Sequence, residues 1–217
     1  MRNLFVFLLG IVLFSVNAQD ADNSFREDQL YFSVSYPFFS NPPNELIQNK
    51  LSYAISLGFI RDMPINTSRT LALGLGLGWS HATVFNNSQF VVADESVSAT
   101  IAQQDSQQNQ LSMQSLVVPF EVRWRNATAS KHAFWRIHSG ISLHVPMKLA
   151  SFYSSGSTKD RVVIPSKDVL LSWHLNFGFN TWNISVLHDL QPWANATTAN
   201  GIFDIKFTRI GLIFYIF

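Results

Sequence analysis

Large apolar side chains recur at every second position in several segments of the chain. The period is strictest from Leu71 to Trp79, where the large residues alternate with Ala72 and three glycines. A two-residue period is typical of a β-strand, and three glycines so close together would strongly destabilise a helix. The same alternation runs through residues 51–59, 116–124, 135–145 and 173–179. The pattern therefore predicts an all-β chain.

The alternating segments predict eight antiparallel strands. We expect them near residues 29–38, 49–60, 69–85, 112–125, 133–149, 169–179, 182–189 and 202–217. The links are long at 39–48, 86–111, 150–168 and 190–201, and short at 61–68, 126–132 and 180–181. This alternation is typical of transmembrane barrels, which have short periplasmic turns and longer outside loops. The chain is thus expected to form an eight-stranded antiparallel transmembrane β-barrel, with its C-terminus in the periplasm.

The composition separates such a barrel from a soluble β-sandwich, which shows the same alternation. In the five segments the large-residue face carries no charge, and the opposite face is polar or small, as a narrow lumen requires. Charged residues make up 13% of the chain, whereas a soluble domain has about 25%. Trp124, Trp135 and Trp182 flank expected short turns, and Tyr215 and Phe217 lie near the same rim. Tyr36 and Trp79 lie toward the other rim, so the sequence predicts two interfacial aromatic girdles.

The N-terminus predicts export. Arg2 precedes a short apolar run, and small residues before Gln19 suit a signal peptidase. The run is too short for a membrane-spanning helix, which needs about 20 residues. We expect a cleaved signal peptide over residues 1–18 and a single outer-membrane barrel domain over residues 19–217.

Cysteine and charge content narrow the function classes. The chain has no cysteine, which excludes disulfides and a lipid anchor on a terminal cysteine and favours a bacterial envelope protein. Removing the signal peptide takes away Arg2, one of 15 cations, and leaves a balance with the 14 acidic residues. The sequence shows no nucleic-acid signature, metal-ligand spacing or phosphate-binding glycine loop. We expect no cofactor and no nucleic-acid partner; the expected contacts are outer-membrane lipid and, during biogenesis, the barrel-assembly machinery.

Charged residues on the fourth and fifth strands are candidates for a network inside the barrel. An eight-stranded barrel has room for packed side chains or one small ligand. The hairpin around residues 126–132 is expected to place Glu121 opposite Arg136 or His138, with Arg123 close by. We predict that these four residues form a buried ion-pair network, which satisfies polar groups away from water.

An enzyme is the alternative use of the same interior. Ser142, Glu121 and three histidines, at 138, 144 and 174, are the residue types of a serine–histidine–acid site. Glu121 and His138 are expected toward the periplasmic half, away from outer-leaflet lipid, and no nucleophile motif accompanies them. The sequence therefore favours a protein that is not an enzyme.

The last expected strand carries two further signals. Its final residues, with Gly211, Phe214 and Phe217, resemble the C-terminal signal that the barrel-assembly machinery reads. The large apolar residues also change parity, from odd positions at 203–207 to even positions at 210–214. We expect a bulge near Thr208 to reconcile the two halves.

Several stretches resemble the PorT family, the outer-membrane barrels tied to type IX secretion in Bacteroidetes. The most specific are Arg-Asp-Met-Pro-Ile-Asn at residues 61–66 and Glu-Val-Arg-Trp-Arg at residues 121–125. Residues 26–29 and 134–137 add to the likeness, which spans most of residues 26–140. The resemblance implies a role in exporting cargo with C-terminal sorting domains, and it assigns no catalytic residue.

The resemblance also indicates where partners bind. Its specific stretches cluster at the expected short turns, so Arg61, Asp62, Met63 and Pro64 are predicted to form a docking turn for other secretion-system components at the periplasmic rim. A surface-binding or structural barrel without a secretion role is the second hypothesis, and a lipid-modifying enzyme is the third.

Overall fold

The computed structural model describes residues 28–48, 50–94, 96–101, 109–126, 135–155 and 158–216; the expected signal peptide lies outside these described residues. The described strands are β1 (Gln29–Phe39), β2 (Tyr53–Pro64), β3 (Leu71–Asn86), β4 (Ser88–Ala93), β5 (Ser96–Ile101), β6 (Asn109–Arg125), β7 (Trp135–Ser155), β8 (Thr158–Val163), β9 (Leu170–Phe179), β10 (Trp182–Asp189), β11 (Ala194–Thr198), β12 (Gly201–Ile205) and β13 (Phe207–Ile216). In this part of the chain, no helix is long and apolar enough to cross a membrane.

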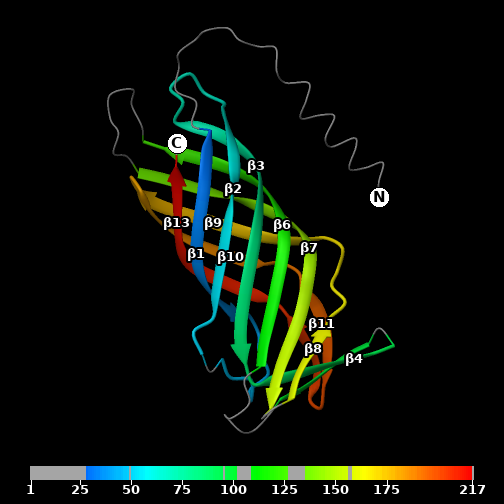
Figure 1. Cartoon of the computed structure of the whole chain (residues 1–217). Coiled ribbons are helices and arrows are strands. Elements are labelled where there is room, and N and C mark those ends of the chain that lie inside the picture. The colour runs from blue at the N-terminus through cyan, green and yellow to red at the C-terminus, as the bar shows by residue number, and fades with distance from the viewer. Residues whose placement is uncertain are drawn as a thin grey trace.

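Eight of the strands close into an antiparallel barrel. Their order around the ring is β1, β2, β3, β6, β7, β9, β10 and β13, and β13 pairs with β1 to complete it. The strands run obliquely, and β1 begins at the same end of the barrel where β13 finishes (Figure 1). We call this the terminal end; β4, β8 and β11 lie at the opposite end, the hairpin end. The predicted eight-stranded barrel is confirmed.

Side chains alternate between the inside and the outside of the barrel along each strand. In β3, Ala72 is 1% exposed and Leu77 is 60% exposed. In β6, Glu121 and Arg123 are each 1% exposed, whereas Val122 between them is 50% exposed. Charge therefore lies inside and apolar surface outside, which is the arrangement that a lipid environment favours.

Exposed tryptophans surround the terminal end of the barrel. Trp135 stacks on Phe177 with ring centroids 5.2 Å apart, and Trp182 meets Phe214 edge-on at 5.4 Å. Trp182 is 66% exposed and Trp124 is 40% exposed. Amphipathic rings at this depth suit the boundary between lipid and water.

The hairpin end holds a second sheet where loops were expected. The β4–β5 and β11–β12 hairpins join through Thr197 and Ser98 into one four-stranded sheet, in the order β12-β11-β5-β4. Its buried side chains, such as Phe90 and Phe203, pack with barrel residues such as Leu111 in one apolar cluster. Much of the expected long loops is therefore strand, because their apolar residues bury against the end of the barrel.

The expected last strand, residues 202–217, is two strands, β12 and β13, in different sheets. They share one inward face, so the expected bulge near Thr208 is wrong. Odd-numbered side chains from Phe203 to Tyr215 are buried, whereas Ile202 and Ile210 are exposed. The pairing of β1 with β13 also runs without a register shift. The inward residues of β12 and the start of β13 are apolar because the interior is apolar at the hairpin end. Toward the terminal end the interior is polar, so the large apolar residues of β13 lie on its outward face.

Candidate functional site

A buried carboxylate joins two arginines inside the terminal end of the barrel. Asp62 of β2 accepts hydrogen bonds from Nη1 of Arg123 and Nη1 of Arg125, both at 2.8 Å. Arg123 also donates through Nη2 to Gln29 of β1, and Arg125 donates from Nε to the carbonyl of Arg69 at 2.9 Å. These charge-assisted bonds tie β1, β2, β6 and the β2–β3 turn together.

Glu121 is a second buried carboxylate, at the next inward position of β6 beyond Arg123. Its Oε1 lies 3.2 Å from Nε of Arg123 and 3.8 Å from Nδ1 of His138. Its Oε2 accepts a hydrogen bond from Nε2 of His174 at 2.9 Å. The structure thus brings together three members of the predicted network, and Arg123 lies between Asp62 and Glu121. Asp62, Arg123 and Glu121 therefore each have a partner of opposite sign, as burial requires.

Arg136, the fourth predicted member, lies over the ring of Tyr215. The guanidinium carbons of Arg136 and Arg123 are each 5.6 Å from the ring centroid, within cation–π range. The Tyr215 hydroxyl accepts a hydrogen bond from Asn176 at 3.1 Å and lies 3.2 Å from Nδ1 of His138. Tyr215 was expected in the aromatic girdle, which is wrong: it is 5% exposed and faces the lumen, as its odd position in β13 indicates.

The register of β6 against β7 differs from the expected one. Glu121 lies opposite Gly140, and Arg123 lies opposite His138, so the expected pairing of Glu121 with Arg136 or His138 is wrong. A Cβ at Gly140 would collide with the backbone of the facing strand, so only glycine fits there. The expected and observed registers differ by an even number of residues, and both therefore keep the same side chains inside.

The expected docking turn at residues 61–64 is in fact the end of strand β2, which runs to Pro64. Arg61 and Met63 are exposed, but Asp62 is 2% exposed and its carboxylate is engaged inside the barrel. Placing Asp62 on a partner-binding surface was therefore wrong. The signal was present, because Asp62 continues the inward even parity of Ala54 and the residues that follow it in β2.

The turn at residues 65–70 is held rigid by hydrogen bonds. Asn66 donates from Nδ2 to Thr70 at 2.8 Å, and its Oδ1 accepts from the first backbone N–H of β3 at 3.1 Å. Arg69 has a positive φ of 55°, and its carbonyl is the acceptor of the buried Arg125. Ile65 at the start of the turn is 57% exposed. The turn therefore presents an ordered surface at the terminal end.

The glycines of β3 make room for bulky neighbours inside the barrel. A Cβ at Gly74 would lie 2.9 Å from Cδ of Arg123, and one at Gly76 would lie 2.7 Å from Cγ1 of Ile60. At Gly78 a Cβ would collide with the Tyr31 hydroxyl. The inward glycines of β3 thus leave space in the lumen for the bulky side chains of the other strands.

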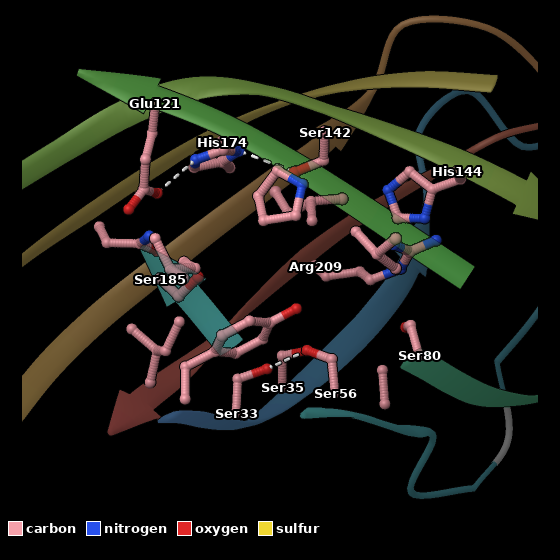
Figure 2. Close-up of a pocket in the computed structure, with 18 residues that line it drawn as sticks. Ser33, Ser35, Ser56, Ser80, Glu121, Ser142, His144, His174, Ser185 and Arg209 are labelled. Atoms are coloured by element: carbon pink, nitrogen blue, oxygen red, sulfur yellow. Dashed lines mark hydrogen bonds and ion pairs between the residues drawn. The ribbon is translucent and has the colours of Figure 1, made fainter. Parts of the chain in front are cut away.

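A small cavity remains in the middle of the lumen. It leaves about 60 Å³ of space for the centres of water molecules, which is enough for several ordered waters. Its wall is rich in hydroxyl groups, contributed by Ser33, Ser35, Ser56, Ser80, Ser142 and Ser185 (Figure 2). The cavity therefore suits water or a very small polar molecule.

Ser142, His174 and Glu121 form a hydrogen-bonded chain on the wall of this cavity (Figure 2). Because His174 donates from Nε2 to Glu121, its Nδ1 accepts from the Ser142 hydroxyl at 2.9 Å. This is the connectivity of a serine–histidine–acid triad. Of the other histidines considered for such a site, His144 bonds Ser115 at 3.1 Å instead. Ser142 is only 3% exposed, so a substrate has no direct approach to it.

Asp189 is the next inward residue of β10 beyond Leu187, which lines the cavity. It accepts hydrogen bonds from Ser172 and Trp193, both at 2.8 Å, and from the backbone N–H of Phe207 at 3.1 Å. Arg209 lies 3.5 Å from this carboxylate, with its guanidinium carbon 5.8 Å from the Trp193 ring centroid. The apolar cluster of the hairpin end lies beyond, so the lumen is plugged on both sides of the cavity.

The expected assembly-signal residues fall on both faces of β13. Gly211 lies opposite Ser35, and a Cβ there would collide with the carbonyl of Val34. Phe214 faces outward and packs on Trp182. Phe217 lies outside the described residues, and recognition by the assembly machinery stays a prediction. Among the described residues, no group of three His, Asp or Glu side chains is placed to hold a metal ion.

Comparisons with known proteins agree with this architecture. The family model described as outer membrane protein beta-barrel domain matches residues 17–194. No curated protein sequence gives a significant match. Among solved structures, the attachment invasion locus protein Ail of Yersinia pestis is similar over 88% of this chain and 99% of its own, with 10% identity and a TM-score of 0.36. That likeness is too distant to carry a functional argument.

Proposed function

The chain belongs to the outer membrane protein beta-barrel domain family, and on that premise we propose that this integral outer-membrane barrel supports protein secretion as a non-catalytic docking subunit. The resemblance to the PorT family supplies the pathway, which is type IX export of cargo with C-terminal sorting domains. Other components of the secretion system are the proposed partners, and they bind at the terminal end, which we place in the periplasm.

The ordered turn at residues 65–70 is the observation that carries this proposal. Its backbone is fixed by Asn66 on one side and by the lumen residue Arg125 on the other. Met63 and Ile65 are 40% and 57% exposed beside it. A preorganised surface with exposed apolar side chains loses little conformational freedom when a partner binds.

The plugged lumen supports a docking role over a conducting one. The cluster around Asp62 fills the terminal end of the barrel and the Asp189 cluster closes the hairpin side. An eight-stranded barrel is also too narrow for folded cargo. The protein therefore acts on export through the components that it holds, with Arg61, Met63 and Ile65 as its contact residues.

A non-catalytic role accounts for the triad-like chain as structure. Ser142 and His174 are nearly inaccessible, and the cavity beside them has room for several waters and no acyl chain. Glu121 also pairs with Arg123, which holds its charge in place. The chain is best explained as a way to satisfy buried polar groups.

Complementation of a deletion strain tests the docking surface. The double variant Arg61→Ala/Ile65→Asp is expected to lose most export of cargo with the sorting domain, while the barrel keeps its heat-modifiable band in mild detergent. The matched control is Thr100→Glu/Ala199→Glu, at two exposed positions of the hairpin end, which is expected to export normally. Normal secretion by the deletion strain itself would reject the secretion role.

A surface-binding barrel is the second candidate function. The hairpin-end sheet favours it, because this sheet has its own apolar core and presents Ser98, Thr100 and Thr197 on its exposed face. If only the Thr100→Glu/Ala199→Glu variant shows a defect, this second function replaces the first.

Single cysteines test the orientation cleanly, because the natural chain has none. Thr67 and Thr197 are both exposed, at the terminal end and the hairpin end respectively. On intact cells, a membrane-impermeant maleimide is expected to label Thr197→Cys and not Thr67→Cys. The opposite pattern would place the turn at residues 65–70 outside the cell, where the proposed periplasmic partners could not reach it.

A further inference from the structure

A cationic patch lies on the outer wall of the hairpin end, away from both the lumen and the turn at residues 65–70. Lys148 of β7 and Arg161 of β8 lie over the ring of Phe152, with Nζ and Cζ each 5.8 Å from its centroid. Phe152 and Arg161 are opposite one another in the β7–β8 ladder. Within the described part of the chain, neither cation forms an ion pair with a carboxylate.

An irregularity in β7 brings apolar surface directly to this patch. Lys148 lies opposite Gln114 and Pro146 lies opposite Ser115, so Met147 between them has no opposite residue in β6. Such a bulge turns two successive side chains toward one face. Met147 is 60% exposed next to Lys148. In β8, Val163 is 59% exposed, on the same side as Arg161. Toward the hairpin end, Lys148 thus lies just beyond exposed Met147 in β7, and Arg161 lies just beyond exposed Val163 in β8.

Counted along the paired strands, the patch lies beyond the lipid-facing run of β3. In β3, the lipid-facing run from Leu71 to Trp79 has the length of a membrane-crossing strand, about 9–11 residues. The next outward residue is His81, which stacks on Trp79 at 5.9 Å. His81 lies opposite Gln114, which lies opposite Lys148. The patch therefore begins where the apolar band ends.

We propose that Lys148, Arg161 and Phe152 form a binding site for the phosphate headgroup of a membrane lipid. A guanidinium holds phosphate with two parallel hydrogen bonds, and an ammonium adds a mobile point charge. Met147 and Val163 provide the apolar surface against which the acyl chains of the same lipid lie. The site needs no secretion partner, and it is independent of the proposed docking function.

Native mass spectrometry of the detergent-folded full-length protein tests the site. The probes are phosphatidic acid, which carries a phosphate monoester, and the diacylglycerol with the same acyl chains. The double variant Lys148→Gln/Arg161→Gln is expected to lose phosphatidic acid adducts by about tenfold. The matched control Lys50→Gln/Lys167→Gln removes two other exposed cations and is expected to retain them.

Each outcome decides the proposal. Loss confined to the Lys148/Arg161 variant, with weak binding of diacylglycerol, supports a phosphate headgroup site. Equal loss in both double variants means that only general charge is involved and overturns it. Equal binding of diacylglycerol also overturns it. If the double variant lacks the heat-modifiable band, Arg161→Gln alone is used, because Arg161 is exposed on the outside of β8.

Discussion

The two halves of the barrel interior share one strand pattern and contain opposite chemistry. In the terminal half, charged side chains such as Asp62, Arg123 and Glu121 are buried and joined to one another. In the hairpin half, the inward positions of the same or adjoining strands carry Val84, Leu111 and other apolar residues. Lipid requires only that the outside of the barrel be apolar. The inside can therefore be filled with charged side chains or with apolar ones.

The difference between the halves lies in what holds each together. The apolar half is stabilised by burial, which is non-directional and tolerates changes of shape. The polar half depends on each partner being present, since a buried charge that loses its partner is strongly destabilising. Substitutions are therefore expected to have larger effects in the terminal half.

Asp62→Ala is expected to have the largest effect. It removes the carboxylate shared by Arg123 and Arg125, at a cost of about 3–5 kcal/mol. The folded, heat-modifiable band should convert at a much lower temperature or urea concentration than in the natural protein. Arg61→Ala is the control, because Arg61 is the exposed neighbour in the same strand. If both variants unfold alike, Asp62 does not hold the terminal half together.

Glu121→Ala is expected to cost about 3 kcal/mol, because it leaves Arg123 with one carboxylate and His174 with no acceptor on Nε2. The same unfolding measurement applies, with Val122→Ala on the lipid face as the control. Ser139 is a poorer control, since its hydroxyl donates to the carbonyl of His174 at 3.0 Å. A Glu121 variant as stable as Val122→Ala would show that the network is dispensable.

Phe207→Leu tests the apolar half and is expected to cost only about 1 kcal/mol. Phe207 is fully buried against Phe39, with ring centroids 4.7 Å apart. Leucine keeps most of the apolar volume, and no polar partner of its side chain is lost. A loss as large as that of Asp62→Ala would show that the hairpin half is packed as specifically as the terminal half.

Ser142→Ala is expected to have the smallest effect, below about 1 kcal/mol, because water in the adjoining cavity can donate to Nδ1 of His174 in place of the hydroxyl. The natural protein is also expected to resist serine-directed fluorophosphonate reagents. Labelling that disappears in Ser142→Ala would instead establish a reactive serine and reopen the enzyme hypothesis.

Local pattern was enough to predict the barrel but not the second sheet. The two-residue period marked five of the eight barrel strands and the face that each turns to lipid. The hairpin-end strands are short, and the β4–β5 hairpin alone joins only a few apolar residues, such as Phe90 with Ala99 and Val97 with Val92. Their burial depends on β11 and β12, which come about 100 residues later in the chain. The sequence pattern does not reveal that contact.

The sequence by itself determined which side chains face inward, because parity is a local property of an extended chain. It thereby determined that Glu121, Arg123, Arg136 and His138 share the lumen. Only the tertiary structure decided the partners, since shifting a register by two residues leaves every face unchanged. Close packing made that choice at Gly140, where the facing backbone leaves no room for a Cβ. It also brought Asp62 from another strand between two arginines.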